Sequence, residues 1–130
     1  VNLEISHHYG IEKFYETGIT MITVVNREYC KKLIIVLPGQ HHPEQYHKKK
    51  EETFVVLHGE VELRLDGVSS DFKRGDVITI EPGVRHGFTT SSGCVIEEVS
   101  STHYKDDSYY TDQKIHDNKN RKTFITHWID

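Results

Sequence analysis

A chain of 130 residues has the size of a single domain, and its formal net charge of −4 argues against a nucleic-acid-binding protein. The basic run at residues 48–50 is followed directly by Glu51 and Glu52, which cancel most of its field. Two cysteines, Cys30 and Cys94, are too few for a disulfide framework and predict buried free thiols. No apolar run approaches the roughly 20 residues of a membrane span, and the first residues lack a signal-peptide pattern, so we expect a cytoplasmic protein without a membrane partner.

Along the chain, short β-branched or alternating runs are separated by turn residues such as Pro38-Gly39 and Asp66-Gly67. A weak helical signal covers residues 11–16 and stops at Gly18, whereas the polar stretch 102–121 predicts an irregular arm. Many short strands with frequent turns predict an all-β sandwich or barrel, of which the jelly roll is one form. The predicted strands are 19–25, 33–37, 54–58 (ended by Gly59), 61–65, 77–80, 87–90, 95–99 and 122–129.

A first motif begins at Gly39. Five residues separate it from Gln45-Tyr46-His47, four more precede Glu52, and six more precede Gly59. This spacing resembles the first motif of the cupin superfamily, in which a glycine precedes a His-x-His pair, a glutamate and a closing glycine.

A second motif follows in the expected order. Gly75 precedes Pro82-Gly83, and His86 comes three residues after that second glycine, followed by Phe88. It resembles the second cupin motif, which ends in a metal-binding histidine. Together the two resemblances imply the cupin double-stranded β-helix, a jelly-roll barrel, with a short helical N-terminal element. We expect one cupin domain over residues 1–130, excised from a longer chain because Val1 is not a start methionine.

Simple geometry supports a shared site for four of these residues. Gln45 and His47 are two apart, so in a strand they point to the same face. Glu52 lies beyond a short turn, and His86 starts another strand, so a barrel can bring all four side chains to one point. Two imidazoles, a carboxylate and an amide oxygen suit a divalent ion such as manganese, iron, zinc, nickel or cobalt.

Gln45 departs from the family pattern, which has histidine at this position. Gln45 either remains a weaker oxygen ligand or leaves His47, Glu52 and His86 as a two-histidine, one-carboxylate face of the Fe(II) type. A third possibility is a metal-free pocket that these polar residues merely line. Five other histidines are expected outside the ligand set: His41 and His42 in a rim loop, and His7, His8 and His58 on the surface or in strands.

A narrower resemblance involves the segment 47–52, Glu98-Val99-Ser100 and the stretch 105–107. These are similar to the metal-binding stretch, the Glu-Val-Ser segment and the Asp-rich stretch of the D-lyxose isomerase-like sugar isomerases. The segments 26–32 and 102–105 also resemble the cupin domain attached to some bacterial N-acetylneuraminate (sialic acid) synthases.

The isomerase resemblance implies roles for individual residues. Glu98 would be the catalytic base, an alternative being an exposed or salt-bridged carboxylate. Lys50 would donate to a sugar oxygen, an alternative being a solvated surface lysine. Arg85 would bind a carboxylate or phosphate of the substrate, an alternative being an exposed rim arginine, and Gln45 would contact the substrate. The tyrosines of the arm (Tyr104, Tyr109 and Tyr110) are expected to pack on the barrel wall, an alternative being a lid or a dimer contact.

Three functions therefore remain open on the sequence. The first is a metal-dependent sugar isomerase or epimerase with a small carbohydrate substrate. The second is a non-catalytic sugar-binding module of a sialic acid synthase, and the third is an Fe(II)-dependent oxygenase. The cupin resemblance also implies a homodimer, since cupins commonly pair through edge strands, which covers an otherwise adhesive sheet edge.

Overall fold

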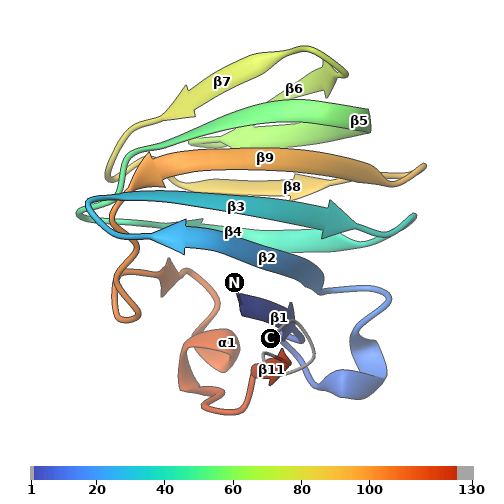
Figure 1. Cartoon of the computed structure of the whole chain (residues 1–130). Helices are drawn as coiled ribbons and strands as arrows, with labels where there is room; N and C mark the ends of the chain where they lie inside the picture. Colours follow the sequence, from blue (N-terminus) through green and yellow to red (C-terminus); the bar gives the residue numbers. More distant parts are fainter. Residues whose placement is uncertain (1, 126–130) are drawn as a thin grey trace.

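A computed structural model describes residues 2–125 of the chain (Figure 1). Strands dominate it, and the helices are one short 3₁₀ turn near the N-terminus, as predicted, and one short α-helix in the arm. The elements in chain order are β1 (Asn2–Ser6), η1 (Ile11–Lys13), β2 (Ile19–Asn26), β3 (Tyr29–Val36), β4 (His41–Tyr46), β5 (Glu52–Leu65), β6 (Val68–Lys73), β7 (Val77–Ile80), β8 (His86–Thr89), β9 (Cys94–Ser101), β10 (Tyr109–Tyr110), α1 (Gln113–Asp117) and β11 (Lys122–Ile125).

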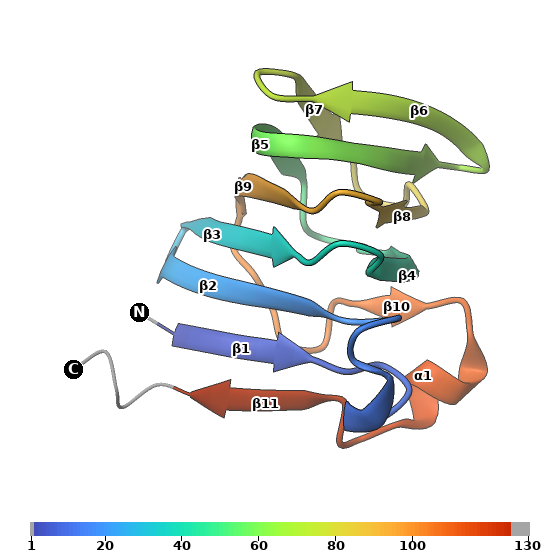
Figure 2. The same ribbon diagram turned by 90° about the vertical axis from the view of Figure 1, so that its right-hand side faces the viewer.

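The strands pair antiparallel in the order β10-β4-β8-β5-β9-β3-β2-β1-β11, with β6 and β7 also paired to β5. Figure 2 shows β11, β1, β2, β3 and β9 side by side in this order. The sheet curls into two facing layers, and β4 and β8 lie behind β3 and β9 in Figure 1. The predicted jelly-roll barrel of the cupin type is thereby confirmed.

Strand β5 belongs to both layers. Its first half pairs with β7 and β9, and its second half pairs with β6 and β8. The prediction that Gly59 ends a strand is wrong, because the strand continues through it after a bulge between Val56 and His58. Gly59 has φ 78° and a Cβ there would lie 2.1 Å from the Gly93 carbonyl oxygen, so this position just after the bulge requires glycine.

The inward faces of the strands are apolar at one end of the barrel and polar at the other. On β9, Cys94 and Ile96 are followed on the same face by Glu98, and on β5 Phe54 is preceded by Glu52. The alternation of inward and outward side chains thus continues along each strand, but the inward side chains turn from apolar to charged. The charged groups therefore lie directly on top of the core. The core itself consists of Ile19, Met21, Ile34, Val36, Phe54, Val56, Val61, Leu63, Ile80, Phe88, Cys94 and Ile96.

The chain contains more regular structure than predicted. β1, β4 and β6 were not anticipated, and the arm over residues 102–121 contains β10 and α1. Asp112 caps α1 by accepting a hydrogen bond from the backbone N–H of Lys114. The last predicted strand begins as expected at Lys122, and its part beyond Ile125 lies outside the described residues. Cys30 and Cys94 are buried free thiols, as predicted.

Within residues 2–125, no helix is long and apolar enough to cross a membrane.

Candidate functional site

Three predicted residues meet at the polar end of the core. His47 follows β4, while Glu52 and His86 are the first residues of β5 and β8. Glu52 Oε1 lies 2.9 Å from His86 Nε2 and 3.6 Å from His47 Nε2. All three side chains are nearly inaccessible, and their candidate ligand atoms lie within 4.8 Å of one another. The spacing suits three donors around one cation.

Hydrogen bonds on the far side of each ring orient the two histidines. His47 Nδ1 lies 2.8 Å from the carbonyl oxygen of Asp107, and His86 Nδ1 lies 3.0 Å from that of Val84. A carbonyl only accepts, so Nδ1 carries the proton in both rings. In the neutral ring Nε2 then presents a lone pair toward Glu52, which is the tautomer that a metal-binding histidine needs.

The buried atoms at the centre lack the partners that buried polar atoms normally have. His86 Nε2 and Glu52 Oε1 approach closely but without the alignment of a hydrogen bond, and both are buried and unsatisfied. Two converging acceptors around a common point are the arrangement that a divalent cation would complete. The residues therefore fit a metal ion by the chemistry of the donor set.

Electrostatics at this point also favour a cation. Burial acts against ionisation of Glu52, but polar contacts with His47 and His86 and the charge of Lys50 hold its pKa well below the ordinary value. Burial likewise disfavours the charged form of His86, but the contact with Glu52 prevails and raises its pKa. A proton and a metal ion would thus compete for His86 Nε2.

Gln45 lies beside this trio, in register with His86 across the β4–β8 pair. His42 Nδ1 lies 2.9 Å from the Pro43 carbonyl, so His42 Nε2 is left as an acceptor. The amide nitrogen of Gln45 is 3.5 Å from that Nε2, which assigns it as a long donor. The amide oxygen is consequently turned away from His42, and it is buried without a partner.

Lys50 and Glu98 form a buried charged pair next to the trio. Lys50 Nζ lies 3.1 Å from Glu98 Oε2 and 3.2 Å from Glu52 Oε2, and both Lys50 and Glu98 are 4% exposed. Glu98 faces inward from β9, as the proposed role of base requires, and Lys50 is not the solvated lysine of the alternative interpretation. Burial opposes the charge of Lys50, but the carboxylates of Glu98 and Glu52 raise its pKa above the ordinary value.

Two cationic or basic side chains at this site were missed. Lys32 faces Glu98 across the β3–β9 pair and is 2% exposed, and burial lowers its pKa. His103 Nδ1 lies 3.5 Å from Lys50 Nζ, and burial together with the charges of Lys32 and Lys50 lowers the pKa of His103 to about 3. The inward period of β3 would have identified Lys32, whereas no local pattern marks His103.

The expectation of a rim loop for His41 and His42 is wrong, because both lie in β4 and His42 is buried in the wall of the site. A bulge after His42 shifts the strand register. The sequence of this strand therefore lacks a regular alternation of inward and outward residues. His8 is also buried rather than superficial, and its ring packs edge-on against His42. His58 is exposed within β5, as predicted.

Arg85 is the one predicted site residue that the structure does not bring to the cavity. Its side chain is exposed and lies 5.8 Å from the ring centre of Tyr46. Of the arm tyrosines, Tyr110 lines the cavity and Tyr109 stacks on Tyr46, whereas Tyr104 is 45% exposed. The cavity has a volume of about 40 Å³, which is enough for an ion and a water molecule.

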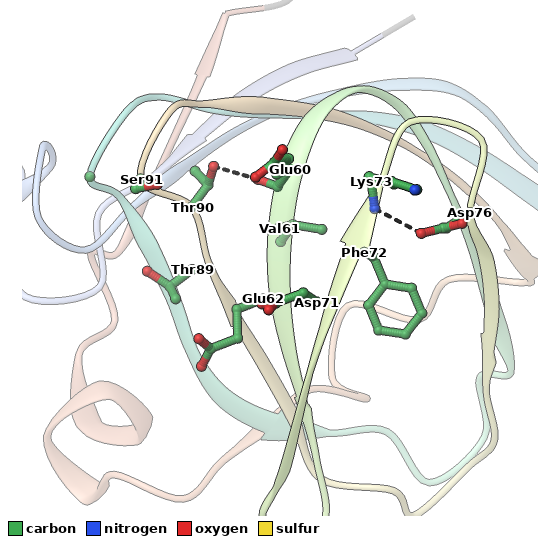
Figure 3. Close-up of a pocket in the computed structure, with 11 residues that line it drawn as sticks. Glu60, Val61, Glu62, Asp71, Phe72, Lys73, Asp76, Thr89, Thr90 and Ser91 are labelled. Atoms are coloured by element: carbon green, nitrogen blue, oxygen red, sulfur yellow. Dashed lines mark hydrogen bonds between the residues drawn. The ribbon is translucent and has the colours of Figure 1, made fainter.

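A much larger hollow lies elsewhere, over β5, β6 and β8 (Figure 3). It measures about 710 Å³ and is lined by carboxylates, hydroxyls and the single cation Lys73. Its groups bond within the wall: Thr90 Oγ1 donates to the Glu60 carbonyl and Lys73 N–H donates to Asp76. None of its described side chains is a buried polar group without a partner, so the chemistry of the molecule is better assigned to the small cavity.

The family model of the cupin domain matches residues 32–97, and the chain belongs to the cupin family. This match spans the strands and loops that supply the His47, Glu52 and His86 trio.

Among curated proteins, the D-lyxose/D-mannose isomerase of Thermosediminibacter oceani is 27% identical over 88% of this chain and 78% of its own length. The D-lyxose ketol-isomerase of a Thermofilum species is also 27% identical, over 82% of this chain and 76% of its own.

Solved structures of similar fold include the ligand-free L-ribose isomerase of Cellulomonas parahominis, with a TM-score of 0.77 at 14% identity over 86% of this chain and 81% of that one. KdgF from a Halomonas species has a TM-score of 0.62 at 17% identity, covering 68% of this chain and 82% of its own. At these identities the structural likeness shows the shared fold.

Proposed function

We propose that this protein is a metal-dependent aldose–ketose isomerase acting on a monosaccharide or a derivative of one. The observation that carries the proposal is the contact of the buried His47–Glu52–His86 trio with the Lys50–Glu98 pair. Aldose–ketose isomerisation needs such a combination, a Lewis acid for the developing oxyanion and a nearby acid–base group. The names of the curated relatives support the same reaction class.

His47, Glu52 and His86 would hold the metal ion, with Gln45 supplying its unpartnered amide oxygen. The bound ion would supply charge stabilisation for the sugar oxygens. Manganese, iron, zinc, nickel and cobalt all accept two imidazoles, a carboxylate and an amide oxygen, so the ligand set leaves the choice among them to experiment.

Glu98 would take the proton from C2 of the sugar and return it to C1 through an enediol. Its position on an inward strand face, 3.1 Å from Lys50 Nζ, turns the carboxylate toward the cavity that it lines. Lys50 would remain protonated, since its pKa is raised, and would donate a hydrogen bond to a sugar oxygen. Because the cavity of about 40 Å³ cannot hold a whole monosaccharide, only the C1–C2 end would enter it.

The test is deuterium wash-in. D-Lyxose, D-mannose and L-ribose are incubated in D₂O with the protein loaded with each candidate metal, and exchange at C2 is followed by NMR. Wild type should exchange at least one sugar, and Glu98→Gln should lower the rate by about 10²-fold or more. The control is Glu97→Gln, the outward-facing neighbour paired with Lys31, which should retain the wild-type rate. Exchange that persists at full rate in Glu98→Gln refutes the assignment of the base.

The trio also favours a second candidate, because two histidines and one carboxylate form the face used by non-haem Fe(II) oxygenases. Oxygen uptake with ferrous ion, together with no exchange on any sugar, would move the assignment to an oxygenase. Sugar binding by calorimetry without exchange and without oxygen uptake would instead indicate the non-catalytic sugar-binding module.

A further inference from the structure

A second, larger cavity of about 500 Å³ adjoins the metal cavity, and we call it the basic cleft. Its size lies in the range of small-molecule sites, whereas the metal cavity is smaller by an order of magnitude. Lys32, His103 and Lys122 line both cavities, so the two lie on either side of the same three side chains. A ligand whose reacting end enters the metal cavity would therefore extend into this cleft.

The lining of the cleft is strongly positive. Five of its eleven lining residues are lysine or arginine, and Glu4 is the one carboxylate among them; the cations are Lys32, Lys105, Lys119, Arg121 and Lys122. Glu4 is already engaged, since its Oε2 lies 3.2 Å from Lys122 Nζ. The chain as a whole has a net charge of −4, so this concentration of cations is local.

Lys32 is the most informative of these cations. It is 2% exposed, yet among the described residues it makes no ion pair. The comparably buried Lys50 is paired with two carboxylates. A buried charge without a direct ion pair is unfavourable, and burial outweighs the attraction of Glu98 and lowers the pKa of Lys32. An anion placed at the junction of the cavities would remove this penalty.

Arg121 provides a second buried donor at the same place. Its guanidinium lies 5.2 Å from the ring centre of Tyr110, which holds the side chain, and its Nε is buried without a hydrogen-bonding partner. Nη1 donates to the carbonyl of Asn118, so the group is fixed while one of its N–H groups remains free. Arginine in this state suits an oxyanion.

We propose that the basic cleft binds an anionic group, a phosphate monoester or a carboxylate, at the end of the sugar opposite the reacting carbons. The identification of the ligand as a sugar rests on the proposed function, whereas the preference for an anion rests on the cleft itself. This assignment takes the anion-binding role away from Arg85, which lies outside both cavities.

The test uses three sugars that differ at one carbon: D-mannose, D-mannose 6-phosphate and D-mannuronate. Binding to the metal-loaded protein is measured by isothermal titration calorimetry at low and at raised salt. At least one of the two anions should bind about tenfold tighter than D-mannose at low salt, and the difference should shrink as salt is raised. The tighter of the two anions identifies phosphate or carboxylate as the group recognised.

Charge reversal locates the effect. Lys105→Glu/Lys119→Glu changes two exposed lysines of the cleft and should abolish the preference for the anion. The control Lys13→Glu/Lys73→Glu makes the same change in net charge at two exposed lysines outside the cleft and should retain the preference. Equal affinity for neutral and anionic sugars, or equal losses in both double variants, overturns the proposal.

The outcome separates this proposal from the proposed function, because binding is read without turnover. Suppose that anion preference depends on Lys105 and Lys119 but the protein exchanges no sugar proton. This result would support anion binding in the basic cleft and contradict the isomerase proposal. Normal exchange on a neutral aldose, with no tighter binding of either anion, would support the isomerase proposal and contradict anion binding in the basic cleft.

Discussion

The backbone carbonyl of Asp107 accepts the Nδ1 proton of His47 at 2.8 Å, across 60 residues of sequence. The carboxylate of the same Asp107 accepts the backbone N–H groups of residues 48–50 at 3.0–3.2 Å. One buried residue of the arm therefore orients a candidate metal ligand and shapes the turn that delivers Lys50. Partners behind the ligands commonly tune metal affinity in this way.

Asp107→Ala should therefore weaken both metal binding and folding. We expect metal affinity to fall about 10- to 100-fold, because the turn holding His47 is no longer fixed. The free energy of unfolding should fall by about 1–3 kcal/mol, because three backbone N–H groups, one of them buried, lose their acceptor. Chelator competition and urea denaturation measure the two effects. Asp106→Ala, its exposed neighbour, should change neither quantity, and equal effects in both variants would contradict this role.

Lys50→Met should destabilise the metal-free protein by about 3–5 kcal/mol, since it leaves the buried carboxylates of Glu52 and Glu98 facing each other without a cation. Thermal or urea unfolding in the presence of a chelator measures this cost. Lys49→Met, at an exposed position beside it, should cost far less.

A second comparison tests whether the loss of stability in Lys50→Met is caused by the loss of its charge. The double variant Lys50→Met/Glu98→Gln should lose less stability than the sum of the two single variants, because the second change removes one of the stranded charges. Strict additivity would mean that Lys50 contributes through packing of its alkyl stem instead.

Local sequence rules predicted the centre of the site well. The period of two along a strand placed Glu98 with Cys94 and Ile96, and motif spacing brought Glu52 and His86 together. These relationships depend only on strand geometry and on the barrel that the motifs indicate, so they can be read from the chain.

The surroundings of the site depend on contacts that no local pattern contains. His103 and Asp107 come from an arm that reads as irregular, and their roles arise from docking against residues 48–50 more than fifty positions earlier. His42 was misplaced because a bulge interrupts the alternation of β4. The strand break expected at Gly59 is wrong for a related reason, since a glycine that follows a bulge and a glycine that forms a turn look alike in sequence.

Gln45→Leu tests whether the amide oxygen is a ligand. We expect the affinity for Mn²⁺ or Co²⁺ to fall about tenfold, a moderate loss because a neutral oxygen is a weaker donor than imidazole. His47→Ala and His86→Ala should abolish binding altogether. The visible spectrum of bound Co²⁺ should also change in Gln45→Leu, as it reports coordination number. An unaltered affinity and spectrum would leave Gln45 as a pocket residue outside the metal sphere.

His8 predicts how stability responds to acid. Burial, together with the charges of Arg121 and Lys122, lowers the pKa of His8 to about 3 from its ordinary 6.5. Between these values the unfolded chain binds a proton that the folded protein refuses, so stability is lost as pH falls from 6.5 toward 3. The contribution of this one group approaches about 1.4 kcal/mol per pH unit.

The comparison of wild type with His8→Gln isolates this effect from other titrating groups. Glutamine keeps a polar side chain near the Tyr110 hydroxyl, which lies 3.3 Å from His8 Nε2, but it takes up no proton. His8→Gln should therefore gain stability relative to wild type as pH is lowered from 6.5 to 4, while His116→Gln, exposed on α1, should follow wild type. Parallel pH curves for His8→Gln and wild type would mean that His8 takes up its proton in the folded and the unfolded chain alike, so that its burial has no part in acid unfolding.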